Sequence, residues 1–161
     1  MAGQEVETVK RAPRWGCLWL VAAALGCTTP PSHEQLEATL RRVASAEPEL
    51  ARGARVVVVH ADSEMAAWAQ LAAASAEGPS AMSRGLAQSF EGAARTRLDF
   101  AVGGPYDSLN DRTLLDAFAL VRAPRLSGLR VLLVSPKPPS EKLREAARAR
   151  GARLMHRAFP P

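Results

Sequence analysis

The stretch Arg55-Val-Val-Val-Val-His60-Ala61 is the clearest β-strand in the sequence. Four consecutive valines indicate a central strand that is buried on both faces, as in a sheet covered by helices on each side. Because side chains alternate along a strand, Val57 and Val59 should face one helical layer while Val56 and Val58 face the other. The stretch therefore predicts a layered α/β fold.

Segments of the same kind recur along the chain. Further strands are expected at 98–102, 130–134 and 153–159. Helices are expected from Ser32 to before Pro48, after Asp62-Ser63 up to Gly78, at 81–95, from Ser108 or Asn110 to Val121, and at 140–150. The expected helix caps are Ser32, Asp62-Ser63, Ser108 or Asn110, and Ser140. Strands that alternate with helices predict a single three-layer α/β domain over 33–161, with a mostly parallel sheet of about four strands and helices on both faces.

Ligands of parallel sheets bind beyond the carboxyl ends of the strands. The residues expected there are His60, Asp62, Ser63, Gly103, Gly104, Tyr106, Asp107, Ser108, Ser135 and Lys137. His60, with a carboxylate from Asp62 or Asp107, could act as general base for a nucleophilic Ser108, which would suit a small hydrolase. The sequence has no G-x-S-x-G elbow to expose that serine, however, and Asp62, Ser63 and Ser108 are also residue types that cap helices.

Other chemistry-bearing motifs are absent from the sequence. Gly103-Gly104 favours a tight turn that needs a positive φ over a phosphate cradle, because neither G-x-G-x-x-G nor G-x-x-x-x-G-K-[ST] occurs. The three histidines, His33, His60 and His156, lack metal-ligand spacing. We therefore expect no metal and no cofactor, and we favour a binding module over an enzyme.

The amino-terminal region has the pattern of an export leader. Lys10, Arg11 and Arg14 form a cationic segment, and an uncharged run of about 12 residues follows from Trp15 to Gly26, which suits a signal peptide and is well below the ~20 residues that span a bilayer. Both cysteines, Cys17 and Cys27, fall inside or at the end of this leader, so no internal disulfide is expected.

The end of the leader, Ala24-Leu-Gly-Cys27, resembles the lipobox of bacterial lipoproteins, although Ala24 stands where that family usually has Leu. The resemblance, which covers the leader alone, implies that 1–26 is a signal peptide cut before Cys27, that Cys27 carries lipid, and that 27–32 is a short tether. It also implies the periplasmic face of the outer membrane, with the inner membrane as the alternative, because these lipoproteins often carry Asp after the cysteine when they stay at the inner membrane, and here Thr28 follows. Two alternatives remain, namely cleavage by ordinary signal peptidase near Ala22-Ala-Ala24 and a buried apolar helix in a cytosolic protein.

Charge is distributed unevenly. Residues 28–117 hold eight Lys and Arg against twelve Asp and Glu, whereas 118–161 hold ten against two. Arg122, Arg125, Lys142, Arg144 and Arg148 are the candidate binding residues, because a basic face attracts anionic surfaces. An acidic envelope protein or an anionic polymer would suit an exported protein. Nucleic acid is not expected, and a merely solvated helix face is the competing interpretation.

The leader and the charge pattern favour a lipid-anchored accessory or binding module in the periplasm, held at the membrane by its amino-terminal lipid. The alternative is the small periplasmic hydrolase built on His60, Asp107 and Ser108. The two differ in whether His60 is needed for activity.

Overall fold

The computed structural model describes residues 31–50, 53–96, 98–122 and 125–159, so the leader and Cys27 lie outside the described residues. The described residues form five helices and four strands: α1 (His33–Ser45), β1 (Arg55–Val58), α2 (Glu64–Glu77), α3 (Ala81–Thr96), β2 (Phe100–Gly103), α4 (Asp107–Leu120), β3 (Arg130–Ser135), α5 (Glu141–Ala149) and β4 (Arg153–Ala158). Each expected strand and helix of the domain is present, with boundaries that differ by a few residues.

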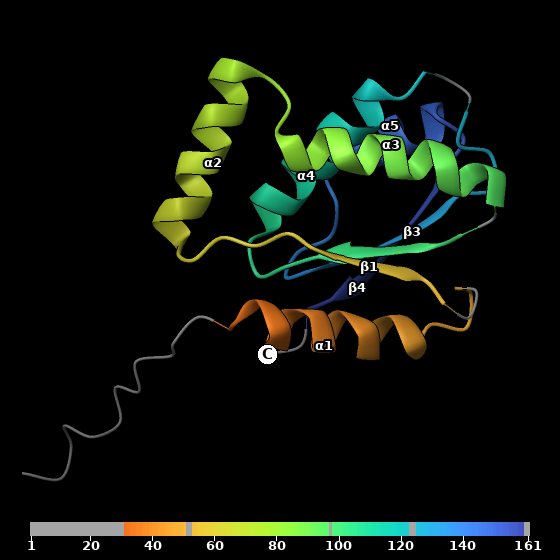
Figure 1. Ribbon diagram of the computed structural model, residues 1–161, viewed down its shortest axis with the longest axis horizontal. Coiled ribbons are helices and arrows are strands. Elements are labelled where there is room, and N and C mark those ends of the chain that lie inside the picture. The colour runs from red at the N-terminus through yellow and green to blue at the C-terminus, as the bar shows by residue number, and fades with distance from the viewer. Residues whose placement is uncertain (1–30, 51–52, 97, 123–124, 160–161) are drawn as a thin grey trace, which may run out of the picture.

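The four strands form one parallel sheet in the order β1-β2-β3-β4. The sheet has α1 on one face and α3, α4 and α5 on the other, whereas α2 stands beyond the carboxyl edge of the strands (Figure 1). The predicted three-layer α/β domain is therefore confirmed. The helical layers are unequal, because each connection between successive strands runs over the same face and only α1 covers the other.

The valine run lies at an edge of the sheet, so its prediction as a central strand was wrong. Among the described residues β1 pairs only with β2, and β2 and β3 occupy the centre. Val58 and Val59 are buried, but Val56 and Val57 are only half-buried because no strand covers their outer side. The predicted alternation holds, since Val57 and Val59 pack with the larger helical layer and Val56 with α1.

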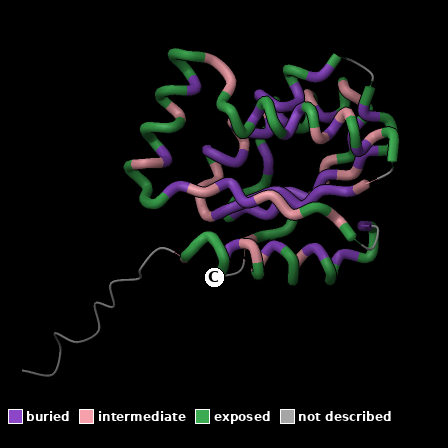
Figure 2. Tube along the Cα trace, in the orientation of Figure 1, coloured by how far each residue is buried: buried purple, intermediate pink, exposed green. Residues whose placement is uncertain are grey.

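Each face of the sheet has its own apolar core (Figure 2). On the larger side the Phe90 ring meets Phe100 edge-on at 5.0 Å between centroids and stacks on Phe118 at 5.4 Å. On the other side Leu40 of α1 packs over Leu132 of β3. The buried aromatic rings therefore lie in the core of the larger side, whereas the buried core of the other side is aliphatic.

Helix caps follow the sequence except at α4. Ser32, Ser63 and Ser140 each accept a hydrogen bond from a backbone N–H in the first turn of α1, α2 and α5. The prediction of Ser108 or Asn110 as the cap of α4 was wrong: α4 begins at Asp107, and both residues lie inside its first turn. Asn110 is fully buried, and its side chain makes a different contact, which belongs to the candidate site.

Candidate functional site

Gly103 and Gly104 allow the three strands β1, β2 and β3 to come together at their carboxyl ends. A Cβ atom on Gly103 would lie 1.9 Å from the carbonyl oxygen of Val134, and one on Gly104 would lie 2.0 Å from that of Val59. Neither glycine has a positive φ, so the expected tight turn with a positive φ is not what they provide. Their role is close backbone approach, which any side chain would prevent.

Asn110 ties the start of α4 to this glycine pair. Its Nδ2 atom donates a hydrogen bond of 2.9 Å to the carbonyl oxygen of Gly104. The side chain is fully buried, and its Oδ1 atom has no hydrogen-bond partner among the described residues. Sequence reasoning treated Asn110 only as a possible cap, and no signal in the sequence indicates that its amide would turn inward.

The proposed hydrolytic corner is not joined by hydrogen bonds. His60 Nδ1 lies 3.6 Å from Asp62 Oδ1, whereas Asp107 Oδ2 lies 3.2 Å from Lys137 Nζ. Ser108 is exposed in the first turn of α4, and in the described part of the chain no hydrogen bond links it to His60. Of the two carboxylates expected to orient the imidazole, Asp62 lies beside it and Asp107 pairs with Lys137 instead. Among the described residues, no hydrogen bond connects Ser108 to a base.

The end of β3 forms a turn that holds Lys137 in place. The hydroxyl of Ser135 donates a 2.6 Å hydrogen bond to the carbonyl oxygen of Lys137, and Ser135 itself is buried. On the other side of β3 the Nε2 atom of His156 lies 3.2 Å from the Ser135 carbonyl oxygen. Ser135 is thus part of the turn structure, with its hydroxyl already engaged.

Two of the three histidines meet, although they are far apart in the sequence. The rings of His33, at the start of α1, and His60, after β1, contact each other edge-on at 5.8 Å between centroids. His156 lies elsewhere, on β4. Within the described ranges no group of three or more His, Cys, Asp or Glu side chains is placed to hold a metal ion. The histidine pair marks where α1 begins beside the end of β1.

No family model, curated protein or solved structure matches the chain. Among the described residues, no helix combines the length and apolar character needed to cross a bilayer.

The five basic candidate residues are all exposed, but they do not have equal surroundings. Arg144 pairs with Glu141 at 2.8 Å, and Arg125 lies 4.0 Å from Glu91. Arg122, Lys142 and Arg148 have no ion-pair partner among the described residues, so these three are the cations left for an external partner.

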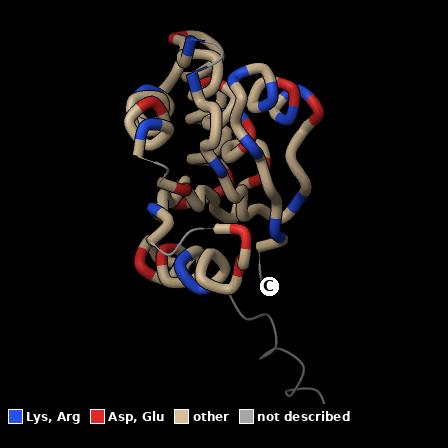
Figure 3. Tube along the Cα trace, turned by 90° about the vertical axis from the view of Figure 1, so that its right-hand side faces the viewer, with Lys and Arg blue, Asp and Glu red and all other residues tan. Residues whose placement is uncertain are grey.

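Ion pairs between the two halves of the chain cancel much of the charge asymmetry of the sequence. Carboxylates of the acidic region meet arginines of the basic region in the pairs Asp99–Arg130, Glu49–Arg153, Glu47–Arg157 and Glu91–Arg125. Figure 3 shows the result, with blue and red segments interleaved over the surface. The sequence could not show this, because these partners are far apart along the chain. The basic region is therefore no continuous basic face.

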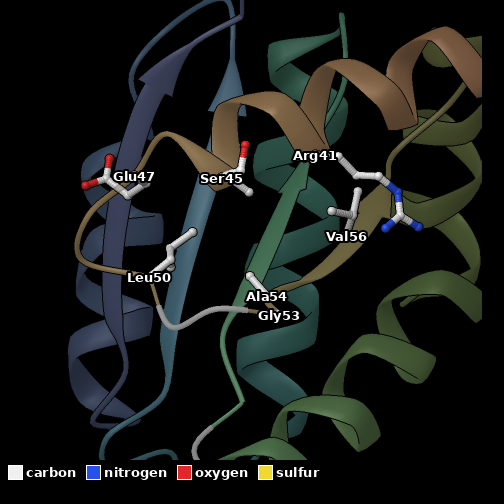
Figure 4. A pocket seen from close by; sticks show the side chains of 8 residues that line it. Arg41, Ser45, Glu47, Leu50, Gly53, Ala54 and Val56 are labelled. Carbon is white, nitrogen blue, oxygen red and sulfur yellow. The ribbon is translucent and has the colours of Figure 1, made fainter.

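Larger hollows lie between α2 and its neighbours, under the end of α1 and, with about 580 Å³, beside Ser127 and Arg130 at the amino-terminal ends of β3 and β4. A cavity of about 460 Å³ separates α2 from α3 and α4, and at its wall Arg112 donates to Asp116 and to the Ala74 carbonyl oxygen. A hollow of about 380 Å³ lies under the end of α1, between Ser45, Leu50 and Ala54 (Figure 4). The polar groups that line the first cavity are mostly engaged with one another, and the second is lined largely by small or apolar residues.

Proposed function

We propose that this chain is a lipid-anchored accessory module of the cell envelope, which binds an acidic partner protein or an anionic polymer. The observation that carries the proposal is the order of its parts: a cationic segment, an apolar run and Ala24-Leu-Gly-Cys27 are followed almost at once by a folded domain. The domain begins at Ser32 with a capping box, in which the Ser32 and Gln35 side chains each accept a hydrogen bond from the other residue's backbone N–H. A lipid on Cys27 would thus hold the domain close to the membrane.

Metabolic labelling tests the anchor. Cells that express the full chain are fed a palmitate analogue, and the protein is examined for the label. The parent should carry the label and Cys27→Ser should lose it. Cys17→Ser is the matched control, because it removes the other cysteine, from the apolar run, and should leave the label unchanged. Equal labelling of the parent and Cys27→Ser would overturn the proposal.

The residue after the cysteine supports a place on the periplasmic face of the outer membrane. Thr28 stands where many lipoproteins of the inner membrane carry Asp. We expect the parent in the outer-membrane fraction and Thr28→Asp in the inner-membrane fraction. If both variants stay in the inner membrane, the anchor remains but the proposed location is wrong.

The surface cations Arg122, Lys142 and Arg148 support the binding of an anionic partner. All three are exposed and lack ion pairs in the described residues, so binding to them breaks none of the ion pairs seen among those residues. Binding of an acidic polysaccharide should weaken steeply with salt, since the Debye length falls from about 10 Å at 0.1 M to about 3 Å at 1 M.

Charge-reversal variants distinguish a specific role of these cations from a general effect of the net charge. Arg122→Glu with Arg148→Glu should abolish the binding to the polysaccharide. The control Arg42→Glu with Arg95→Glu makes the same change in net charge at exposed positions on α1 and α3 and should retain most of the binding. Equal binding by the parent and by Arg122→Glu with Arg148→Glu would mean that the cations are only a solvated surface.

A further inference from the structure

The α2 helix presents an apolar face to the outside of the molecule. Only Ala67 and Ala74 of α2 are buried, on its inner side. Met65 and Trp68 are 77% and 60% exposed, and Figure 2 shows most of the helix in the colour of exposed residues. Ala69, Ala72 and Ala76 are also exposed and follow Met65 at helical spacing, so the outward face carries no charge from Met65 to Ala76.

Such a face is unusual for a helix in contact with water. Surface helices place polar residues opposite their buried stripe, and a helix that is apolar all round is normally covered on every side. Large exposed side chains such as Trp68 and Met65 on one continuous stripe therefore indicate a surface that another apolar phase covers.

The start of α1 lies at the same end of the molecule as this helix, and His60 connects the two. The His33 ring touches the His60 ring at 5.8 Å, and Gln70 of α2 donates a 3.4 Å hydrogen bond to the His60 carbonyl oxygen. Figure 1 shows α2 and the first turn of α1 at the same end of the molecule. Cys27 precedes His33 by six residues, which span at most about 20 Å when fully extended.

We infer that the outward face of α2 lies on the lipid bilayer, with Trp68 and Met65 inserted among the headgroups. This inference rests on the proposed lipid anchor at Cys27. The anchor places a membrane within reach of α2, because the start of α1 and α2 both contact His60. Trp is well suited to the membrane interface, because its ring is apolar and its N–H can still be hydrated.

The length and the charges of α2 define how it would lie. Its 14 residues measure about 21 Å, so the helix rests in the plane of the interface and does not cross the bilayer. Asp62 and Glu64 are exposed next to the apolar face, and no Lys or Arg occurs within α2. The contact therefore needs no anionic lipid, unlike that of most amphipathic surface helices.

Trp68 is its own probe for the contact. The chain has three tryptophans, and Trp15 and Trp19 leave with the leader, so the lipidated protein would keep only Trp68. The protein is expressed with its leader, purified from membranes in detergent and returned to phosphatidylcholine vesicles. In the same sample, the mass of the amino-terminal peptide reports whether lipid is attached. Trp68 emission should shift to the blue, and acyl chains brominated near the headgroups should quench most of it, since such helices lie ~5–10 Å deep.

Variants of exposed residues localise the effect. Met65→Glu with Ala72→Glu should remove most of the quenching, because two charges would then face the bilayer. The control Ala149→Glu, at an exposed position of α5, should leave it unchanged. The emission of an environment-sensitive dye attached to the new cysteine of Ala72→Cys should shift to the blue. The emission of the same dye on Ala149→Cys should not shift.

The outcomes separate the two proposals. If the protein is lipidated but Trp68 is not quenched, the anchor is correct and the membrane contact of α2 is wrong. A partner protein would then be the remaining candidate to cover that face. Quenching that persists in Met65→Glu with Ala72→Glu also overturns the contact through this face. If the amino-terminal peptide carries no lipid, both proposals fail.

Discussion

Asp99 accepts two hydrogen bonds from Arg130, from Nε to Oδ1 at 2.9 Å and from Nη2 to Oδ2 at 2.7 Å. The pair joins the residue before β2 to the first residue of β3, at the amino-terminal edge of the sheet. The Asp99 side chain is 1% exposed and the Arg130 side chain 35%. A buried carboxylate is thus neutralised by a cation that water still reaches, which lowers the cost of burying the charge.

Truncation of Arg130 should destabilise the fold. Arg130→Ala removes both charge-assisted hydrogen bonds to a buried carboxylate, so we expect the free energy of unfolding to fall by about 2 kcal/mol. Arg130→Lys should lose less than Arg130→Ala but remain less stable than the parent, because an ammonium cannot form both bonds in this geometry. Urea unfolding measures the loss. The control Arg144→Ala breaks an exposed pair with Glu141 and should cost under about 1 kcal/mol. Equal midpoints for Arg130→Ala and Arg144→Ala would contradict this account.

The effect of Arg130 should not change over ordinary alkaline pH. Hydrogen bonding to the Asp99 side chain raises the pKa of Arg130 above its ordinary value. A cation whose folded pKa is raised contributes its full stability below its unfolded pKa, which for arginine lies far above pH 10, and this stability is lost only as the pH rises through the folded pKa. The difference in unfolding free energy between Arg130→Ala and the parent should therefore stay constant from pH 7 to about pH 10. A difference that shrinks over this range would show that another group controls the pair.

Arg157 and Arg153 form a matched test of burial. Both lie on β4 and are similarly exposed, but Arg157 pairs with Glu47, whose side chain is 3% exposed, and Arg153 with Glu49, at 46%. Arg157→Ala should cost about 2–3 kcal/mol because it leaves a buried carboxylate without this cation, and Arg153→Ala should cost under about 1. Similar losses in urea unfolding would mean that the burial of the carboxylate does not control the cost.

The glycine pair should not tolerate even a methyl group. In Gly103→Ala and Gly104→Ala the new Cβ would meet backbone oxygens at 1.9 and 2.0 Å, which only a shift of the strands relieves, so we expect a loss of at least about 3 kcal/mol or no folding. Gly85→Ala and Gly92→Ala, on the exposed side of α3 with nothing within 4 Å, should gain about 0.5–1 kcal/mol. Thermal unfolding followed by circular dichroism distinguishes these results, and a stable Gly103→Ala would refute the close approach.

Val58→Asp tests the packing of β1. Val58 is 5% exposed, so a carboxylate there would cost several kcal/mol of a total stability of about 5–15. Arg55→Asp, at the exposed first position of the same strand, should fold cooperatively with little loss. A cooperatively folding and soluble Val58→Asp protein would show that the strand is not packed as described.

Substitution of His60 distinguishes binding from hydrolysis. In His60→Ala the imidazole of the hydrolytic corner is lost, and a binding module should still bind acidic polysaccharide as the parent does. Binding isotherms of the two proteins, each checked for folding, give the answer. A folded His60→Ala protein that no longer binds the polysaccharide as the parent does would contradict this expectation and favour a role of the imidazole in the site, as in the hydrolase.

Local patterns in the sequence predict most of this fold. Alternation of strands and helices gives the layers, and Ser32, Ser63 and Ser140 cap the helices that follow them. The place of a strand in the sheet is not local. The valine run indicates burial but carries no information on neighbours, so β1 was expected at the centre and lies at the edge.

The candidate site was less predictable, because it depends on contacts between distant residues. Of the two carboxylates that the sequence offers for His60, Asp62 lies beside the imidazole, whereas Asp107 lies against Lys137, which follows the next strand. The His33–His60 contact and the buried amide of Asn110 likewise require the fold to be known. Residue types at strand ends thus identify where chemistry could occur, but not which groups meet.

The position of α1 has a consequence for the order of assembly. α1 is the first element of the domain to be synthesised, but its Leu40 and Ala44 pack on Leu132 and Val134 of β3, about 90 residues later. Successive strands can pair as they emerge, because each one lies beside the strand before it. Part of the apolar stripe of α1 can pack on β1 and β2 as they emerge, but its contact with Leu132 and Val134 must wait for β3. Until then the uncovered part of the stripe is a natural target for a chaperone that holds unfolded chains.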